Sequence, residues 1–147
     1  MIALRNFTKN DVSVLNKMRY PNQTPEDIMK MIDEWDSKLY DNRYFEMFAV
    51  VDDNCIVGMV SLFQHTETVI SDGIEIFAPY CKRGYGFKAV SLALEYARSL
   101  GYKIAVAPVR IDNNASVALH KKLGFEIDHE FVNRKGNAVY FFIKSLS

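Results

Sequence analysis

Strand-like and helix-like segments follow one another along this chain without strict alternation. A strand and two helices come first and are followed by three strands in a row. A helix, a strand, a helix and a closing pair of strands complete the order. Successive strands pair as antiparallel hairpins, whereas strand–helix–strand units give parallel pairs. The order therefore predicts a mixed α/β (α+β) fold, with one central sheet of about seven strands and about four flanking helices on its two faces.

Capping residues, turn residues and hydrophobic periodicity set the expected boundaries. Thr24 and Pro25 give the clearest helix start, because threonine caps a first turn and proline suits its first position. Residues 52–54 form a hairpin turn, and Ser71-Asp72 is expected to be a polar turn. The expected helices cover a first segment from the capping residues 8–11 to about Tyr20, then 24–39, 86–100 and 113–123. The expected strands cover residues 2–7, 45–51, 55–63, 73–77, 103–109, 125–131 and 138–143.

Composition and charge narrow the class of protein. With 147 residues, 49% apolar and 24% charged, the chain fits a single globular domain, residues 1–147. Eighteen basic residues balance eighteen acidic ones, so no net field favours nucleic acid or an anionic membrane. Cys55 and Cys81 have no zinc or disulfide spacing, and no apolar run is long enough to span a bilayer. We expect a cytoplasmic protein without a metal, which binds any charged ligand at a local patch.

The segment Lys82-Arg83-Gly84-Tyr85-Gly86 lies between a predicted strand and a predicted helix. Glycines let backbone N–H groups approach phosphate oxygens, and the following helix directs its unpaired amides to the same place. Lys88 adds a third cation in the first helical turn, where a positive charge is unfavourable unless an anion compensates it. The segment is a candidate phosphate loop, although an ordinary glycine-rich turn has the same appearance.

The same glycines also match the G-x-G-x-x-A pattern of NAD(P)-binding domains. That pattern requires a strand that runs almost directly into the first glycine. Here residues 78–83, including Pro79, intervene, and this disfavours a dinucleotide-binding domain.

A second polar constellation follows the next strand. On a helix, Asn113, Ser116 and His120 fall at i, i+3 and i+7 and share one face. The row presents an amide, a hydroxyl and an imidazole. A helix whose polar face meets water, with Asn113 as its N-cap, has the same pattern.

Taken together, the two segments resemble the signatures of the GNAT superfamily of N-acetyltransferases, and the resemblance covers nearly the whole chain. The first signature, [Q/R]-x-x-G-x-[G/A] at the start of a helix, corresponds to residues 81–86, and the second to Asn113 through Gly124-Phe125. The resemblance implies acetyl-CoA as cosubstrate and a splayed strand at residues 73–78. The cofactor contacts that it implies are Ile76, Phe77, Ala78, Lys82, Arg83, Gly84, Tyr85, Gly86, Asn113 and Ser116. Two positions depart from the family pattern: Cys81 replaces Gln or Arg, and His120 replaces Tyr.

Acetyl transfer to an amine requires a base for the amine and a proton for the leaving thiolate. His120 is the predicted acid, because an imidazole pKa near about 6.5 suits acid work at neutral pH; a non-catalytic cofactor contact is the alternative. Glu75 is the predicted base, since it projects opposite to Ile74 and Ile76; Asp72, Glu67 or a water chain are rivals. Glu75 as a solvated strand residue is an equal alternative. The cations beside Cys81 would suit a reactive thiol, but a small residue in a Gln or Arg position is the simpler interpretation.

The acceptor is expected to be a primary amine of a small molecule or a protein. The second helix and the segment after it mix acids with aromatic residues, which suits a cationic amine but also an ordinary solvated helix face: Asp33, Glu34, Asp36, Asp41, Trp35, Tyr40 and Tyr44. The departures at Cys81 and His120 leave open a CoA-binding module without catalysis. His65 and His129 are expected on the surface, and a homodimer is possible.

Overall fold

A single mixed sheet organises the chain in a computed structural model that describes all 147 residues. The strand order is β1-β3-β4-β5-β6-β8-β7, and a short β2 pairs with β3. The strands are β1 (Ile2–Asn6), β2 (Leu39–Tyr40), β3 (Arg43–Asp52), β4 (Cys55–Gln64), β5 (Val69–Ile76), β6 (Ile104–Arg110), β7 (Glu126–Val132) and β8 (Ala138–Ser145). The helices are α1 (Val12–Met18), α2 (Pro25–Asp36), α3 (Tyr85–Ser99) and α4 (Asn114–Lys122), with 3-10 turns at Lys9–Asp11 and Ala78–Tyr80. The predicted mixed sheet with four helices is confirmed.

Two apolar cores lie on the two faces of the sheet. On one face α3 packs through Ala89, Ala93 and Ala97 against strand residues that include Leu62 and Ile70. On the other face α1 and α2 supply a second core: Leu15, Ile28 and Ile32 with Ala49, Met59 and Phe77. Because side chains alternate along a strand, Ile70, Ile74 and Ile76 of β5 share the α3 face, while Glu75 and Phe77 share the face of α1 and α2.

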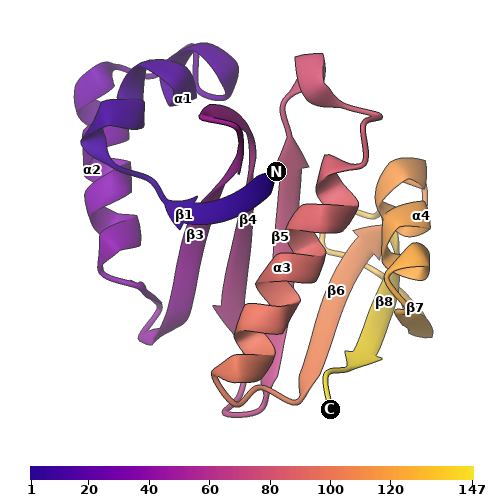
Figure 1. The fold of residues 1–147 in the computed structure, drawn as a ribbon. Coiled ribbons are helices and arrows are strands. Elements are labelled where there is room, and N and C mark those ends of the chain that lie inside the picture. The colour runs from indigo at the N-terminus through magenta and orange to yellow at the C-terminus, as the bar shows by residue number, and fades with distance from the viewer.

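The sheet opens between β5 and β6, the only parallel pair. Their ladder joins residues Val69–Ser71 to Ile104–Val106 and ends there. Beyond it β5 stays paired with β4 as far as Ile76, and β6 stays paired with β8 as far as Arg110. The two strands therefore diverge toward the loop that precedes α3, as Figure 1 shows near its top. The strand predicted to splay from its neighbour is β5.

Two local predictions are wrong. Ser71 and Asp72 lie inside β5, and the turn before that strand is at residues 65–68. Ser71 bonds to His65 across that turn, and Asp72 bonds to His120 of α4. Leu39 belongs to the short β2 rather than to α2, which ends at Asp36 and is followed by a left-handed Lys38.

Candidate acyl-coenzyme site

The loop before α3 presents a row of unpaired backbone amides. The N–H groups of the six residues from Lys82 to Phe87 donate no hydrogen bond within the protein, and Lys88 is the first whose amide does, to the carbonyl of Gly84. Lys82 and Gly84 adopt left-handed φ angles of 65° and 81°. The alternation turns successive amides toward one side, and the N-terminus of α3 adds its positive dipole end. The row of unpaired amides is therefore a candidate anion site made of backbone.

Side chains around this loop hold its shape and add charge. The Tyr85 hydroxyl donates to Asp52 Oδ2 at 2.6 Å, which ties the first residue of α3 to the β3–β4 hairpin. That hydrogen bond raises the pKa of Tyr85. Arg83 lies 5.8 Å from the centre of the Tyr80 ring. Lys82, Arg83 and Lys88 make no ion pair within 4.0 Å, so three cations near the loop are uncompensated by protein carboxylates.

At the end of β5, one of the residues predicted to contact the cofactor through its backbone, Ile76, directs its N–H toward the opening between β5 and β6. The N–H of Phe77 donates to the carbonyl of Val57 at 2.9 Å, on the β4 side. Because successive amides of an extended strand point to opposite sides, the N–H of Ile76 points away from β4, toward the space between β5 and β6. Phe77 is itself engaged: its carbonyl accepts from the N–H of Tyr80, and its side chain is buried among α1 and α2. The geometry therefore favours Ile76 over Phe77, and Ala78 begins the following 3-10 turn.

Glu75 lies on the opposite face of β5, beside α1. Its Oε2 forms an ion pair with Nε of Arg19 at 2.6 Å, and both side chains are nearly half exposed. A small cavity of about 210 Å³ adjoins the pair, lined by Arg19, Tyr20, Met47, Met59, Ser61, Gly73, Ile74 and Glu75. Its rival Glu67 is in the turn at the other end of β5, and its rival Asp72 is buried on the α3 face.

His120 is buried between α4 and the sheet, where only 2% of its surface is exposed. Its Nε2 lies 2.9 Å from Asp72 Oδ2, and its Nδ1 lies 2.8 Å from the carbonyl oxygen of Ser116. Burial lowers the pKa of His120, but the hydrogen bond and charge of Asp72, aided by Ser116, outweigh it, so the pKa is raised. Both ring nitrogens are occupied, and this geometry does not favour direct proton delivery from His120 to a thiolate.

Asn113 and Ser116, the other two residues of the predicted polar row, lie at the start of α4. Asn113 Oδ1 accepts from the N–H of Ser116 at 3.2 Å and so serves as the N-cap, while its Nδ2 has no partner. The Ser116 hydroxyl lies 3.3 Å from Nδ1 of His120. The structure thus joins Ser116 to His120, and it leaves Asn113 exposed at the helix start with one free donor group.

The remaining predicted residues lie apart from this constellation. Cys81 is exposed, with its Sγ 3.5 Å from the carbonyl of Ile76. His129 is paired with Asp128 on the surface, as expected, whereas His65 is half-buried and bonds to Ser71. Burial and the charge of Arg43 lower the pKa of His65.

An acidic and aromatic groove of about 830 Å³ lies where α2 ends and β2 begins. Of the seven residues predicted for such a surface it includes five, and Asp36 and Tyr44 are outside it. The groove is lined by Asp33, Glu34, Trp35, Ser37, Leu39, Tyr40, Asp41, Phe45 and Phe63. The prediction did not include Phe45 and Phe63, because strand alternation alone does not tell which face of β3 and β4 borders α2.

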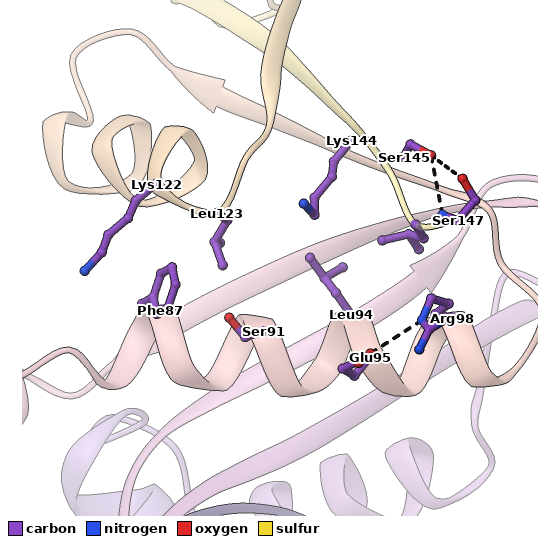
Figure 2. A pocket seen from close by; sticks show the side chains of 11 residues that line it. Phe87, Ser91, Leu94, Glu95, Arg98, Lys122, Leu123, Lys144, Ser145 and Ser147 are labelled. Atoms are coloured by element: carbon purple, nitrogen blue, oxygen red, sulfur yellow. Dashed lines mark hydrogen bonds and ion pairs between the residues drawn. The ribbon is translucent and has the colours of Figure 1, made fainter.

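A second groove, of about 340 Å³, runs between α3 and the end of β8 and was not expected. Figure 2 shows the side chains of Lys122 and Lys144 on its upper side, opposite Phe87 and Ser91 of α3, with Arg98 paired to Glu95 further along. The Lys122 ammonium lies 4.6 Å from the centre of the Phe87 ring. The basic residues come from α3, α4 and β8, which no local pattern connects.

A mixed sheet that opens between two parallel strands, with a glycine-rich loop of unpaired amides beside the opening, is the architecture that the sequence resemblance implied. The chain belongs to the acetyltransferase (GNAT) domain family, whose model matches residues 2–126. The family resemblance seen in the sequence is thereby confirmed. None of the helices is long and apolar enough to cross a membrane. No group of three or more His, Cys, Asp and Glu side chains is arranged to hold a metal ion.

Relatives and solved structures agree with this assignment. The chain is 32% identical over 95 residues to the SPbeta prophage-derived uncharacterized N-acetyltransferase YokL of Bacillus subtilis, which covers 63% of this chain and 54% of YokL. The chain thus spans about half the length of that relative. An acetyl transferase from Salmonella typhimurium that modifies the N-terminal serine of ribosomal protein L7/L12 has the same fold, with a TM-score of 0.84, 16% identity and coverage of 99% and 95% of the two chains. Spermidine N-acetyltransferase from Vibrio cholerae, in complex with CoA and spermine, gives a TM-score of 0.79 at 17% identity, with 99% and 95% covered.

Proposed function

We propose that this protein binds acetyl-CoA and transfers its acetyl group directly to a cationic primary amine. The observation that carries the proposal is the row of six unpaired amides from Lys82 to Phe87, next to the opening between β5 and β6. A pyrophosphate fits such a row, because backbone donors and a helix N-terminus both favour anionic oxygens. The outward amide of Ile76 would then hold the pantetheine arm or polarise the thioester carbonyl.

The acceptor side of the proposal rests on the other face of the sheet. The acidic groove and the cavity at Glu75 are lined by next-but-one residues of the same strands, Phe45 and Met47 on β3, and Phe63 and Ser61 on β4. The groove and the cavity therefore adjoin along one face of the sheet, since Phe63 and Ser61 are about 7 Å apart by strand rise. Carboxylates and aromatic faces both attract ammonium groups. A long amine with several charges fits this arrangement better than a small neutral one, and spermidine is the natural probe.

Glu75 is the proposed base. An arriving ammonium group would compete with Arg19 for the carboxylate, and the carboxylate would take its proton directly or through a water. In Glu75→Gln the shape is kept and the base is lost, so kcat should fall by about 100-fold or more while the KM for acetyl-CoA stays within about twofold. Glu67→Gln, at the far end of β5, is the matched control and should keep its full rate.

The first experiment is a thermal-shift screen with acetyl-CoA, CoA and NADPH, followed by thiol release from acetyl-CoA with spermidine, propylamine and a serine-starting peptide. A ligand that binds only the native state at about 100 times its Kd adds roughly 2.7 kcal/mol of stability. We expect stabilisation by both coenzyme A forms but not by NADPH, and faster turnover with spermidine than with propylamine. Stabilisation by NADPH alone, or no response to CoA, would refute the proposal.

A second candidate is a module of the same fold that binds CoA without catalysis. One observation favours it: neither ring nitrogen of His120 is free to donate to the sulfur. It predicts stabilisation by CoA with no thiol release for any amine in the panel.

A further inference from the structure

The two groups that contact the ring nitrogens of His120 determine its protonation state. Nε2 of His120 faces a carboxylate oxygen at 2.9 Å, and Nδ1 faces a backbone carbonyl oxygen at 2.8 Å. A backbone carbonyl and an ionised carboxylate only accept hydrogen bonds, and Asp72 holds the pKa of His120 above its ordinary value, so both contacts are satisfied by a proton on each ring nitrogen. The Ser116 hydroxyl is the longer contact, at 3.3 Å. The geometry therefore assigns His120 as an imidazolium that is paired with an ionised Asp72.

Asp72 is the one charged group that shifts the pKa of His120. The side chain of Asp72 is fully buried, and that of His120 is 3% exposed. The rings of Phe125 and Phe142 lie against the imidazole at centroid distances of 4.9 and 5.7 Å. Asp72 on β5 and Ser116 on α4 are the groups that raise the pKa of His120. Protonation of His120 thus depends on one carboxylate and one carbonyl.

The free energy of folding does not explain why the protein contains this ion pair. Oδ1 of Asp72 is buried without a hydrogen-bond partner. A buried ion pair with an unsatisfied atom contributes little or nothing compared with apolar residues of similar volume, because desolvation offsets the attraction between the charges. What such a pair does provide is a fixed relative position of the two elements that carry it.

The place of the pair in the fold shows which elements it fixes. The β5–β6 ladder ends at Ser71 and Val106, and Asp72 is the next residue of β5. His120 belongs to α4, which follows β6 on the other side of the opening. The ion pair therefore spans the opening at the point where the two strands separate.

We propose that His120 is a positioning residue and that its ion pair with Asp72 sets the width of the opening between β5 and β6. This rests on the proposed function, since the opening is where the pantetheine arm would lie. Affinity for CoA then depends on the charge state of His120, whereas proton transfer to the thiolate does not involve it.

Three variants test this. His120→Gln places a donor amide near the position of Nε2, so it keeps a hydrogen bond to Asp72 but delivers no proton at neutral pH. His120→Phe removes the bond, and Asp72→Asn removes the charge. We expect CoA binding by calorimetry at pH 7 to weaken at least tenfold for His120→Phe, and to weaken to an intermediate extent for His120→Gln and for Asp72→Asn, each of which removes one charge of the pair.

Two readouts separate positioning from general structural support. The Kd of wild type for CoA should rise as the pH increases through the raised pKa of His120, whereas the Kd of His120→Gln should follow only the titration of the remaining groups. The ring nitrogens of His120 should both be protonated at pH 7 by nitrogen NMR of the unliganded protein. If His120→Phe does not fold, the pH profiles of wild type and His120→Gln decide.

Several outcomes overturn the proposal. A neutral His120 at pH 7, or a folded His120→Phe that binds CoA as wild type does, refutes positioning while leaving the proposed function intact. If His120→Gln binds CoA normally but loses turnover with spermidine by about 100-fold or more, His120 is the acid after all. Wild type that binds no CoA refutes the proposed function itself.

Discussion

Gly84 is the residue on which the geometry of the amide loop depends, and Gly84→Ala should damage the loop without touching any side-chain contact. Its φ angle is +81°, and nothing lies within 4 Å of a Cβ added there. The penalty is therefore one of backbone conformation, about 1–2 kcal/mol for an L residue in the left-handed region. Alanine also lowers the conformational entropy of the unfolded chain, which offsets about 0.4–1 kcal/mol of this loss of stability. The net loss of stability is about 1 kcal/mol by these two values.

The effect on binding should be larger than the effect on stability. A loop that relieves this strain by leaving the left-handed region turns neighbouring amides away from the anion. A hydrogen bond to a charged group contributes about 1.5–3 kcal/mol, so the loss of one weakens CoA binding by about 10- to 150-fold. Gly86→Ala is the matched control. A Cβ at Gly86 makes ordinary contacts, the nearest at 3.6 Å from Leu119, in a residue with helical backbone. Its affinity should match wild type, with stability unchanged or up to about 1 kcal/mol higher.

Calorimetry with CoA and urea unfolding at 25 °C measure both quantities on the two variants. The reasoning fails if Gly84→Ala binds CoA as tightly as wild type, because the loop would then not be the phosphate site. It fails equally if both variants weaken binding to the same degree, since loss of any glycine in this segment would then be enough.

Three further predictions concern stability. Gly58→Ala should destabilise by about 1–3 kcal/mol in urea unfolding, because its Cβ would lie 2.4 Å from the carbonyl oxygen of Glu75 and force β4 and β5 apart; an unchanged midpoint would show that the strands relax freely. Asp11→Asn should lose about 1–3 kcal/mol at pH 7, since the buried Asp11 carboxylate accepts from Arg5 at 2.8 and 3.0 Å. Burial raises the pKa of Asp11, but the Arg5 and Thr8 hydrogen bonds outweigh it and lower the pKa overall, so this advantage is present above about pH 4 and disappears as the pH falls through the lowered value; a difference that persists in acid would contradict this. The pKa of His120 is raised, so the stability that protonation adds to wild type over His120→Gln should be complete below about pH 6.5 and be lost as the pH rises through the raised value. A pH-independent difference would mean that folding leaves the pKa of His120 unchanged, and a difference that grows with pH would mean that the folded protein holds His120 neutral.

Local signals predicted most of the fold. Thr24 caps α2 through the N–H of Asp27, as its position before Pro25 and two acids indicated. The G-x-G segment begins α3, and Asn113 caps α4, because both features depend on a few neighbouring residues. The family model then confirmed the assignment that the two motifs together had suggested.

The error at Asp72 occurred because its partner is distant in the chain. Ser71 and Asp72 resemble a turn because both are polar, but Asp72 is stabilised within β5 by an imidazole 48 residues away. For the same reason no helical pattern distinguishes a His120 that faces a cofactor from one that pairs with a buried carboxylate. The i, i+3, i+7 row placed Asn113, Ser116 and His120 on one face, but it did not tell what that face meets.

The ion pair between Arg19 and Glu75 bears on how an acceptor would enter. Both side chains are nearly half exposed, so the pair contributes about 0–1 kcal/mol and separates easily. Its guanidinium occupies the position that a cationic amine would take at the same carboxylate, 2.6 Å from Oε2. When a cationic amine replaces Arg19 at Glu75, the local charge stays the same. A neutral acceptor would either leave the ion pair between Arg19 and Glu75 in place or separate it without supplying a new positive charge to Glu75. Under the proposed function, Glu75 would therefore select cationic amines at the step where the acceptor binds, before any proton moves.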